Sequence, residues 1–239
     1  MDKGIKTIKE NLSYVEKGFG KNSTKYARSL FQLAELVKKK DRAEARRLLD
    51  ESIAILEQGP EISQTLATAY SYYARFLLKS YSSGDISLAT KSLEHAIYIL
   101  KVLNCSDTMG SISLHSSLAR AHMMSFRPQL AINTVEPCLS TVTNHYYHRK
   151  DVEWRLRMAL SVSYLMKGHL SESLENFKKV ADLQENHNFY VSRADRKSIR
   201  MTIAILNPLC MASQVTSAAV RGCLRCLRWR PWATNEIGN

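Results

Sequence analysis

Apolar residues recur along this chain with the period of an α-helix. In the segment 29–37 they stand at i, i+3, i+4 and i+7 and form one face of a helix: Leu30, Leu33, Ala34 and Val37. A polar break follows at 38–41, and a second apolar stripe begins at Ala45 and ends at Leu56. Two amphipathic helices joined by a short turn are therefore predicted within residues 29–57.

This helix pair occurs four times. Small residues at equivalent positions of the second helices stand 44, 42 and 42 positions apart: Ala45, Ala89, Ala131 and Ser173. The predicted helices are 29–37 with 44–57, 69–78 with 88–100, 114–124 with 130–139, and 157–168 with 172–183. Such a period is the signature of a repeat architecture. A single pair cannot bury its apolar faces, so successive pairs are expected to stack.

The connections between these helices carry residues that start or stop a helix. Asp41 with Glu44 resembles a capping box, and Pro128 stands near the first turn of a second helix. Gly168 is expected to cap a helix C-terminus. The connection 79–86 of the second pair is predicted to be a loop about three residues longer than its counterpart in the first pair.

Helices are also predicted on both sides of the four pairs. Apolar residues at helical spacing precede the first pair: Ile5, Ile8 and Leu12. Residues 188–211 are expected to form a capping helix with four cations on its solvent side: Arg193, Arg196, Lys197 and Arg200. We therefore predict an all-α protein whose repeat domain, an α-solenoid of about ten helices, covers residues 1–212. Residues 213–239 break the pattern and are expected to form a disordered, basic tail.

The repeats resemble tetratricopeptide repeats (TPRs), in particular the 42-residue variety of kinesin light chains, whose pattern is L-x-x-L-A-x-x-Y, a turn, and A-x-x-x-(F/L)-x-x-A-(L/I). Matching positions occur in the first, second and fourth pairs: Leu30, Leu33, Ala34, Val37, Ala45, Leu49, Ser52 and Ile53; Tyr73, Ala74, Leu77, Ala89, Leu93, Ala96 and Ile97; Leu160, Tyr164, Phe177 and Ala181. The resemblance covers about residues 1–185, although Arg157 stands where the pattern has an apolar residue. It implies a right-handed α-solenoid of antiparallel helix pairs, with about four TPR-like repeats and flanking helices.

The resemblance also implies a binding surface, because in such arrays the first helix of each pair lines a concave groove that binds peptides. Carried over by position, the groove residues are Arg28, Phe31, Lys38, Arg75, Lys79, Arg120, Met123, Arg155 and Met158. Arginine can hold carboxylates through two hydrogen bonds, and methionine adapts to irregular apolar surfaces. The expected ligand is an acidic peptide or helix of a partner protein with a hydrophobic or aromatic anchor. The alternative is that these cations simply keep an inner surface soluble.

The composition is that of a soluble globular protein, with 45% hydrophobic and 23% charged residues. No stretch reaches the roughly 18–20 apolar residues of a membrane helix, and the first residues lack the apolar core of a secretory signal. Five cysteines at irregular positions do not indicate a disulfide framework. We therefore expect a cytoplasmic protein, with the nucleus as an alternative.

The net charge of +12 is unevenly distributed, because residues 192–239 carry eight Lys or Arg against two Asp or Glu. In the predicted tail, arginines alternate with apolar and aromatic residues: Arg221, Leu224, Arg225, Leu227, Arg228, Trp229, Arg230 and Trp232. Such a mixture suits an anionic membrane surface or nucleic-acid bases. A tail without a function of its own is the alternative.

No catalytic or cofactor-binding pattern occurs in the sequence. Cys223 and Cys226 have the spacing of zinc ligands, but no second pair of suitable spacing accompanies them. His145 and His148 are expected in a loop between repeats. A glycine-rich phosphate loop and a nucleophile elbow are both absent from the sequence. We therefore predict a non-enzymatic adaptor or scaffold without metal or cofactor, and as an alternative a structural subunit of a larger multiprotein complex.

Overall fold

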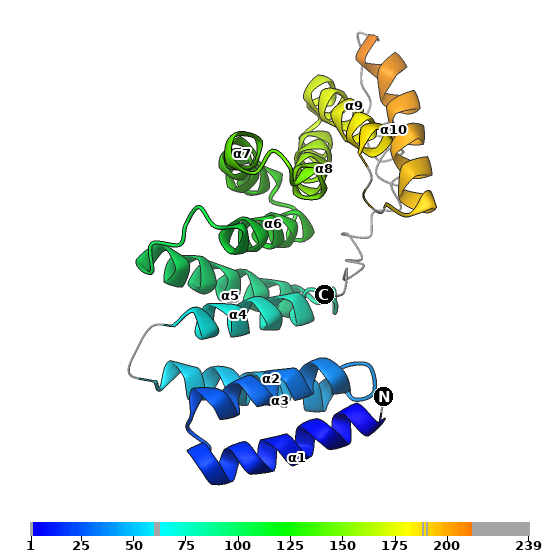
Figure 1. The fold of residues 1–239 in the computed structure, drawn as a ribbon. Helices are drawn as coiled ribbons and strands as arrows, with labels where there is room; N and C mark the ends of the chain where they lie inside the picture. The colour runs from blue at the N-terminus through cyan, green and yellow to red at the C-terminus, as the bar shows by residue number, and fades with distance from the viewer. Residues whose placement is uncertain (1, 60–62, 188, 190, 212–239) are drawn as a thin grey trace. The chain divides into compact units, whose positions relative to one another are not determined.

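The computed structural model describes residues 2–59, 63–187, 189 and 191–211. In these residues it contains ten α-helices and no strand. The helices are α1 (Asp2–Phe19), α2 (Thr24–Val37), α3 (Arg42–Glu57), α4 (Gln64–Leu77), α5 (Ser83–Val102), α6 (Met109–Met124), α7 (Pro128–His145), α8 (Lys150–Lys167), α9 (Leu170–Asn186) and α10 (Arg193–Met211). The prediction of an all-α fold is confirmed, and the helices are labelled in Figure 1.

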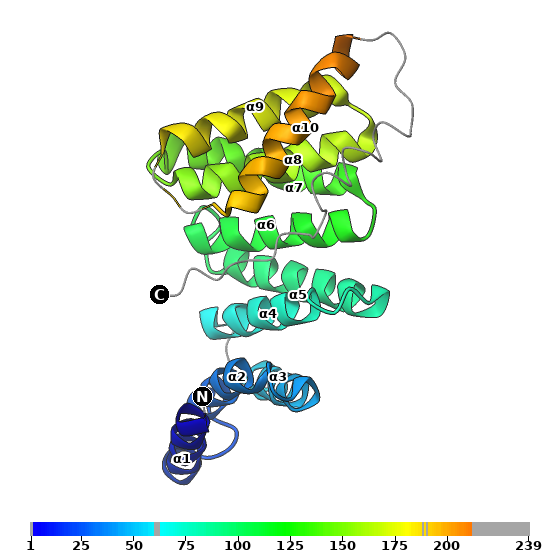
Figure 2. The ribbon, with the colours of Figure 1, turned by 90° about the vertical axis from the view of Figure 1, so that its right-hand side faces the viewer.

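The chain divides into two compact units, residues 1–114 and 115–239, and each is described by itself. In the first unit each helix from α1 to α5 packs on the next one along the chain, and α2 also packs on α4. In the second unit α7 packs on α8, α8 on α9, and α9 on α10. Figure 2 shows α10 lying obliquely across α9. This order of contacts is the one expected of stacked helix pairs.

Small residues allow the two helices of a pair to approach closely. All four residues that marked the repeat are fully buried: Ala45, Ala89, Ala131 and Ser173. The hydroxyl of Ser52 on α3 donates a hydrogen bond to the carbonyl of Ala27 on α2, at 2.8 Å. The hydroxyl of Ser173 on α9 does the same to the carbonyl of Ser161 on α8, at 2.8 Å. The second helix of each of these two pairs is thus held against the first by a buried hydrogen bond.

Three predicted helix ends are confirmed. The Asp41 carboxylate accepts a hydrogen bond from the Glu44 amide at 2.8 Å, which makes Asp41 the N-cap of α3. Pro128 is the first residue of α7, where its missing N–H costs nothing. Gly168 ends α8 with a φ of 80°, a left-handed conformation that glycine adopts without a Cβ clash.

Some helix boundaries differ from those predicted. Helix α5 begins at Ser83, so the connection that was predicted to extend over 79–86 is shorter. Asp85 lies in the first turn of α5, where a carboxylate is favourable, and it pairs with Arg46 at 3.0 Å. Helix α8 begins at Lys150, before the predicted residue 157. Helix α10 begins at Arg193, after the predicted residue 188.

The predicted tail, residues 213–239, lies outside the described residues, as do Cys223 and Cys226. The expected boundary at residue 212 stays a prediction.

Candidate functional site

The predicted groove residues of the first unit lie on or next to two adjoining helices. Arg28, Phe31 and Lys38 belong to α2 or the residue after it, while Arg75 and Lys79 belong to α4 or its end. Because α2 packs on α4, the structure brings the residues of two successive first helices together. This region is called the α2–α4 surface below.

An aromatic and cationic cluster lies where α2 and α4 meet. The ring of Phe31 on α2 stacks on the ring of Tyr72 on α4, with centroids 5.4 Å apart and planes 23° apart. The guanidinium of Arg75 lies 5.3 Å from the centroid of the Tyr72 ring. This arrangement is a cation–π contact, which fixes the planar group of Arg75 over an aromatic face. Phe31, Tyr72 and Arg75 are called the Tyr72 cluster below.

Tyr72 was not among the predicted site residues. Its signal in the sequence is its position one helical turn before Arg75, which places the two side chains on the same face of α4. Tyr72 was overlooked because the position that the repeat pattern specifies is the next residue, Tyr73, which is buried.

The other cations of the α2–α4 surface are held in different ways. Arg28 is exposed and donates a hydrogen bond to the Thr65 hydroxyl on α4, at 3.4 Å. Lys38 forms an ion pair with Glu35, and its side chain is 14% exposed. Lys79 is exposed just beyond the end of α4. Of the predicted cations of this surface, Arg28 and Lys79 are exposed, and Arg75 is half-buried.

In the second unit, the predicted groove residues lie on α6 and α8. Arg155 is exposed on α8, and Arg120 is half-buried on α6. Met123 and Met158 are buried, with exposed fractions of 1% and 8%, and Phe31 of the first unit is also 8% exposed. These three apolar side chains therefore present little surface. The continuous groove that the resemblance implied includes residues of both units, and it stays a prediction.

A buried ion network explains the charged residue in the fourth repeat. The Glu153 carboxylate, whose side chain is 7% exposed, accepts hydrogen bonds from Lys150 at 2.9 Å and from Arg157 at 2.8 Å. Burial raises the pKa of Glu153, but the hydrogen bonds from Lys150 and Arg157 and their positive charges together outweigh it, so the pKa is lowered from its ordinary value. Arg157 is thus compensated from one turn earlier on α8, which is why the apolar position tolerates it.

The shifted tyrosine pKa values lie far above pH 7. Burial, helped by a hydrogen bond to Asp50, raises the pKa of Tyr73 to about 12. Burial also raises the pKa of Tyr164 to about 12, together with its 2.7 Å hydrogen bond to Glu136. Both tyrosines are therefore neutral hydrogen-bond donors, and each bonds to a carboxylate on the neighbouring helix. Acid–base catalysis instead requires groups that titrate near the working pH.

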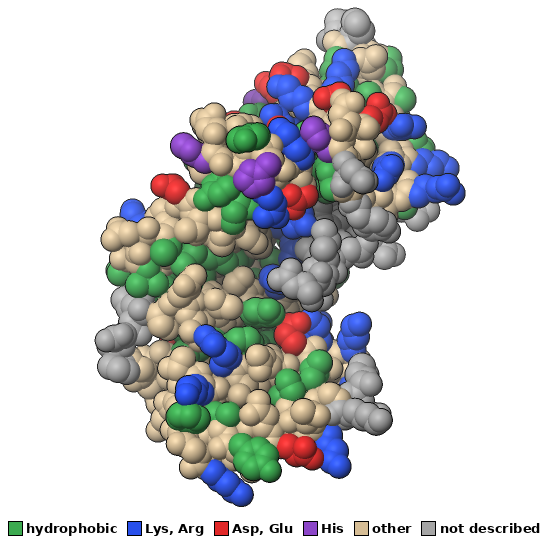
Figure 3. All heavy atoms as spheres, viewed as in Figure 1, with side chains coloured by type: hydrophobic (Ala, Val, Ile, Leu, Met, Phe, Trp, Pro, Cys, Tyr) green, Lys and Arg blue, Asp and Glu red, His purple; other side chains and the backbone are tan. Residues whose placement is uncertain are grey.

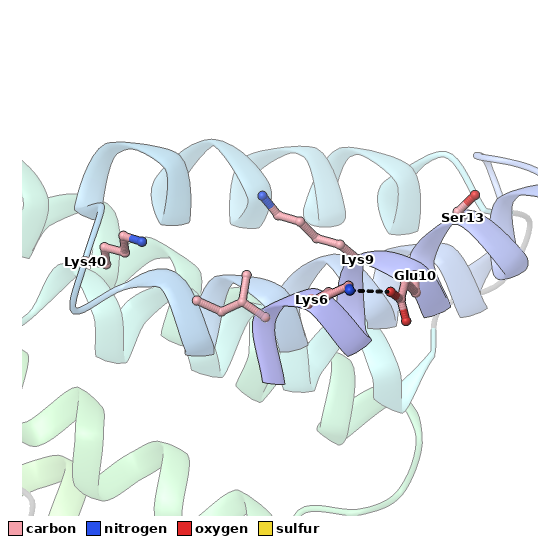
Figure 4. A pocket seen from close by; sticks show the side chains of 6 residues that line it. Lys6, Lys9, Glu10, Ser13 and Lys40 are labelled. Carbon is pink, nitrogen blue, oxygen red and sulfur yellow. Dashed lines mark ion pairs between the residues drawn. The ribbon is translucent and has the colours of Figure 1, made fainter. Parts of the chain in front are cut away.

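An open hollow of about 620 Å³ lies beside α1 in the first unit. Figure 4 shows the side chains that line it: Ile5, Lys6, Lys9, Glu10, Ser13 and Lys40. Lys6 lies 3.9 Å from Glu10, and Lys9 lies 3.9 Å from Glu44, so both cations have an acidic neighbour. None of these residues was predicted as a site residue. The hollow is shallow and mixed in charge, and it presents no chemical constellation of its own.

The described residues offer no site for a resident metal. No group of three or more His, Cys, Asp or Glu in this part of the chain could hold an ion. Among the ten described helices, none combines the length and apolar character needed to span a bilayer.

Comparison with solved structures identifies the fold. The crystal structure of BtubC (BKLC) from P. vanneervenii matches with a TM-score of 0.72 at 15% identity, covering 94% of this chain and 90% of that one. A putative kinesin light chain of Podosopora anserina with nearly identical TPR-like repeats matches with a TM-score of 0.64 at 18% identity, covering 86% and 95%. The chain has the TPR-like fold. No family model matches its sequence, and neither does any curated protein.

The TPR-like fold confirms the resemblance that the repeats indicated, and it assigns each helix its place. The first helices of the four pairs are α2, α4, α6 and α8, and the second helices are α3, α5, α7 and α9. Helices α1 and α10 flank the array. The Tyr72 cluster therefore lies between the first helices of the first two TPR-like pairs.

Proposed function

We propose that this TPR-like protein is a non-enzymatic adaptor whose α2–α4 surface binds an acidic segment of a partner protein. The TPR-like fold suggests a protein-interaction scaffold. The observation that carries the finer proposal is the Tyr72 cluster, in which Arg75 is already oriented over an aromatic ring. An oriented guanidinium loses little side-chain entropy when it binds a carboxylate, so it favours an acidic ligand.

The rest of the α2–α4 surface supports the same ligand. Arg28 and Lys79 flank the cluster with two further exposed cations. The ring of Tyr72 is half-buried between Phe31 and Arg75, and an aromatic side chain of the ligand can pack edge-on against it. Acidic residues would then bind Arg28 and Arg75, and one aromatic anchor between them would contact the cluster. The resemblance to kinesin light chain repeats, which implied an acidic ligand with an aromatic anchor, agrees with this geometry.

A binding measurement with matched variants tests the proposal. The probe is a fluorescein-labelled 12-residue peptide with one tryptophan flanked by aspartates and glutamates, and a lysine-flanked version is its counterpart. The double variant Arg28→Glu with Arg75→Glu should weaken binding of the acidic peptide about 10- to 100-fold, because hydrogen bonds to charged groups contribute about 1.5–3 kcal/mol. The control, Lys91→Glu with Lys101→Glu, changes the net charge equally on exposed positions of α5.

Two outcomes would reject the α2–α4 surface. One is unchanged affinity in the Arg28/Arg75 variant, and the other is an equal loss in the α5 control, which would indicate a general effect of charge. Affinity capture from cells with the wild type beside the Arg75→Glu/Arg120→Glu variant would then identify partners that depend on predicted groove residues in both units.

A second candidate function, a subunit of a larger complex, is favoured by the incomplete burial of α1. Its two aromatic side chains are exposed, Tyr14 at 74% and Phe19 at 56%. Its aliphatic side chains are half-buried rather than buried: Ile5, Ile8, Leu12 and Val15. A partner helix on this side would bury more of their surface and contribute about 25 cal/mol per Å². If so, Ile8→Glu should abolish assembly in size-exclusion chromatography with cell extract, while peptide binding at the α2–α4 surface is retained. If the Ile8→Glu variant retains both assembly and peptide binding, this candidate function is rejected.

A further inference from the structure

The first half of α10 carries four exposed cations on one face: Arg193, Arg196, Lys197 and Arg200. This set is called the basic strip. Residues three and four apart lie on the same side of a helix, so the four side chains point in similar directions. Figure 3 shows Lys and Arg side chains gathered over the beginning of α10. Asp195 is two residues from Arg193 and from Lys197, which places it on the opposite side of the helix.

The opposite, apolar face of α10 holds the basic strip in place. Ile199 is 1% exposed and Leu206 is 0% exposed, and α10 packs on α9. The Arg196 side chain donates a hydrogen bond to the Val191 carbonyl at 3.2 Å. Arg200 pairs with Glu185 at 2.9 Å, but both side chains are at least 60% exposed. Such an exposed pair contributes little free energy, so a stronger anion can replace Glu185.

The chemistry around the basic strip decides which anionic partner it suits. Protein interfaces are anchored by buried aromatic or apolar side chains, and within residues 193–210 of α10 one large apolar side chain is exposed, Met201 at 45%. A helix that inserts into a membrane surface uses its apolar face, but the apolar face of α10 packs on α9, so only charge is left to attract a lipid surface. Phosphates of a nucleic acid require cations and no apolar anchor. The strip therefore matches a nucleic-acid backbone better than a protein or a lipid surface.

We propose that the basic strip of α10 binds the phosphate backbone of a nucleic acid without sequence preference. From Arg193 to Arg200 the helix axis rises about 10 Å, which equals about three base steps of one stacked strand at a rise of ~3.4 Å each. Residues 193–200 contain no aromatic side chain that could stack on a base, so we expect no sequence preference. The sequence that follows α10 carries four further arginines before its one acid, Glu236. This function is separate from the acidic ligand proposed for the first unit.

The test measures binding of the full chain to fluorescein-labelled U20 RNA at several salt concentrations. The strip variant replaces Arg193, Arg196, Lys197 and Arg200 by Gln. The control replaces four exposed lysines of other helices by Gln: Lys17, Lys91, Lys101 and Lys178. A third variant, Arg193→Lys with Arg196→Lys and Arg200→Lys, keeps the charge of the strip. A fourth replaces Arg221, Arg225, Arg228 and Arg230 by Gln. Circular dichroism melts verify that every variant is folded.

We expect the strip variant to bind U20 at least about tenfold more weakly at 0.1 M salt, while the four-lysine control changes about threefold or less. Its log–log salt slope should become less steep by about 0.7 for each lost phosphate contact. The lysine variant should retain affinity within about threefold, because phosphate binding depends mainly on charge.

Three results would overturn the proposal. The first is an equal loss in the four-lysine control, and the second is a loss confined to the variant of residues 221–230. The third comes from two other probes, phosphatidylserine vesicles and polyglutamate. If either loses binding in the strip variant while U20 binding is unchanged, the strip is a membrane or protein site instead.

Discussion

At the scale of single residues, the Glu153 carboxylate shows how a charge is tolerated inside a helical repeat. It lies 2.8 Å from the Arg157 guanidinium and 2.9 Å from the Lys150 ammonium, and all three belong to α8. Removing one member of a buried ion pair leaves the other charge buried without a partner. The resulting loss of stability is larger than the stability that the intact pair contributed. Glu153 is thus required because Arg157 is present.

The lowered pKa of Glu153 predicts a particular dependence of stability on pH. The unfolded-state pKa is near 4.5 and the folded-state pKa lies below it. The ionised carboxylate therefore stabilises the fold above about pH 4.5, and this contribution is lost as the pH falls through the folded-state value. Glu153→Gln should make the free energy of unfolding less dependent on pH in this acidic range. Urea melts at pH 7, 4.5 and 3 measure it.

The matched control for this prediction is Glu94→Gln, which changes an exposed carboxylate of α5. Its pH dependence should be that of the wild type. If Glu153→Gln and the wild type lose stability in parallel from pH 4.5 to 3, the carboxylate does not contribute as described.

At the scale of helices, the spacing within a pair depends on small residues. Ala45 on α3 is 0% exposed, and α3 packs on α2. A leucine at this position has to push the helices apart or adopt an unfavourable rotamer. Ala45→Leu should therefore lower the free energy of unfolding by about 1–3 kcal/mol. The same substitution at Ala54, an exposed position of α3, should change it by less than about 0.5 kcal/mol. Equal effects in chemical denaturation would contradict the close packing.

The sequence predicted the helices well because their signals are local. Helical spacing, the cap at Asp41 and the glycine at Gly168 each act within a few residues, and all are found in the structure. The Tyr72 cluster was missed because it depends on contact between α2 and α4, which are 41 positions apart at Phe31 and Tyr72. The burial of Met123 and Met158 was missed for the same reason. Position within a repeat does not show which neighbours cover a side chain.

At the scale of the whole molecule, a net charge of +12 should affect the association rate constant of an acidic ligand more than the stability of the complex once it has formed. Long-range attraction accelerates the encounter with an acidic ligand and is screened by salt. We expect the association rate constant of the acidic peptide to fall by about tenfold or more between 0.03 and 0.3 M salt. The dissociation rate constant should change much less. Stopped-flow fluorescence measures both constants.

A peptide with the same tryptophan but uncharged flanks provides the comparison. Its association rate should be slower at low salt and nearly independent of salt. A dissociation rate that carries most of the salt dependence would show that close ion pairs, rather than the field of the whole protein, dominate.

The compensation of Arg157 by Glu153 also bears on how such an array can diverge. A charge at a consensus apolar position is neutralised from within the same helix, so no neighbouring helix has to change with it. Each repeat can in this way drift from the consensus independently while its backbone is preserved. In such a lineage the arrangement of the helices would stay similar long after the sequence similarity between relatives was lost.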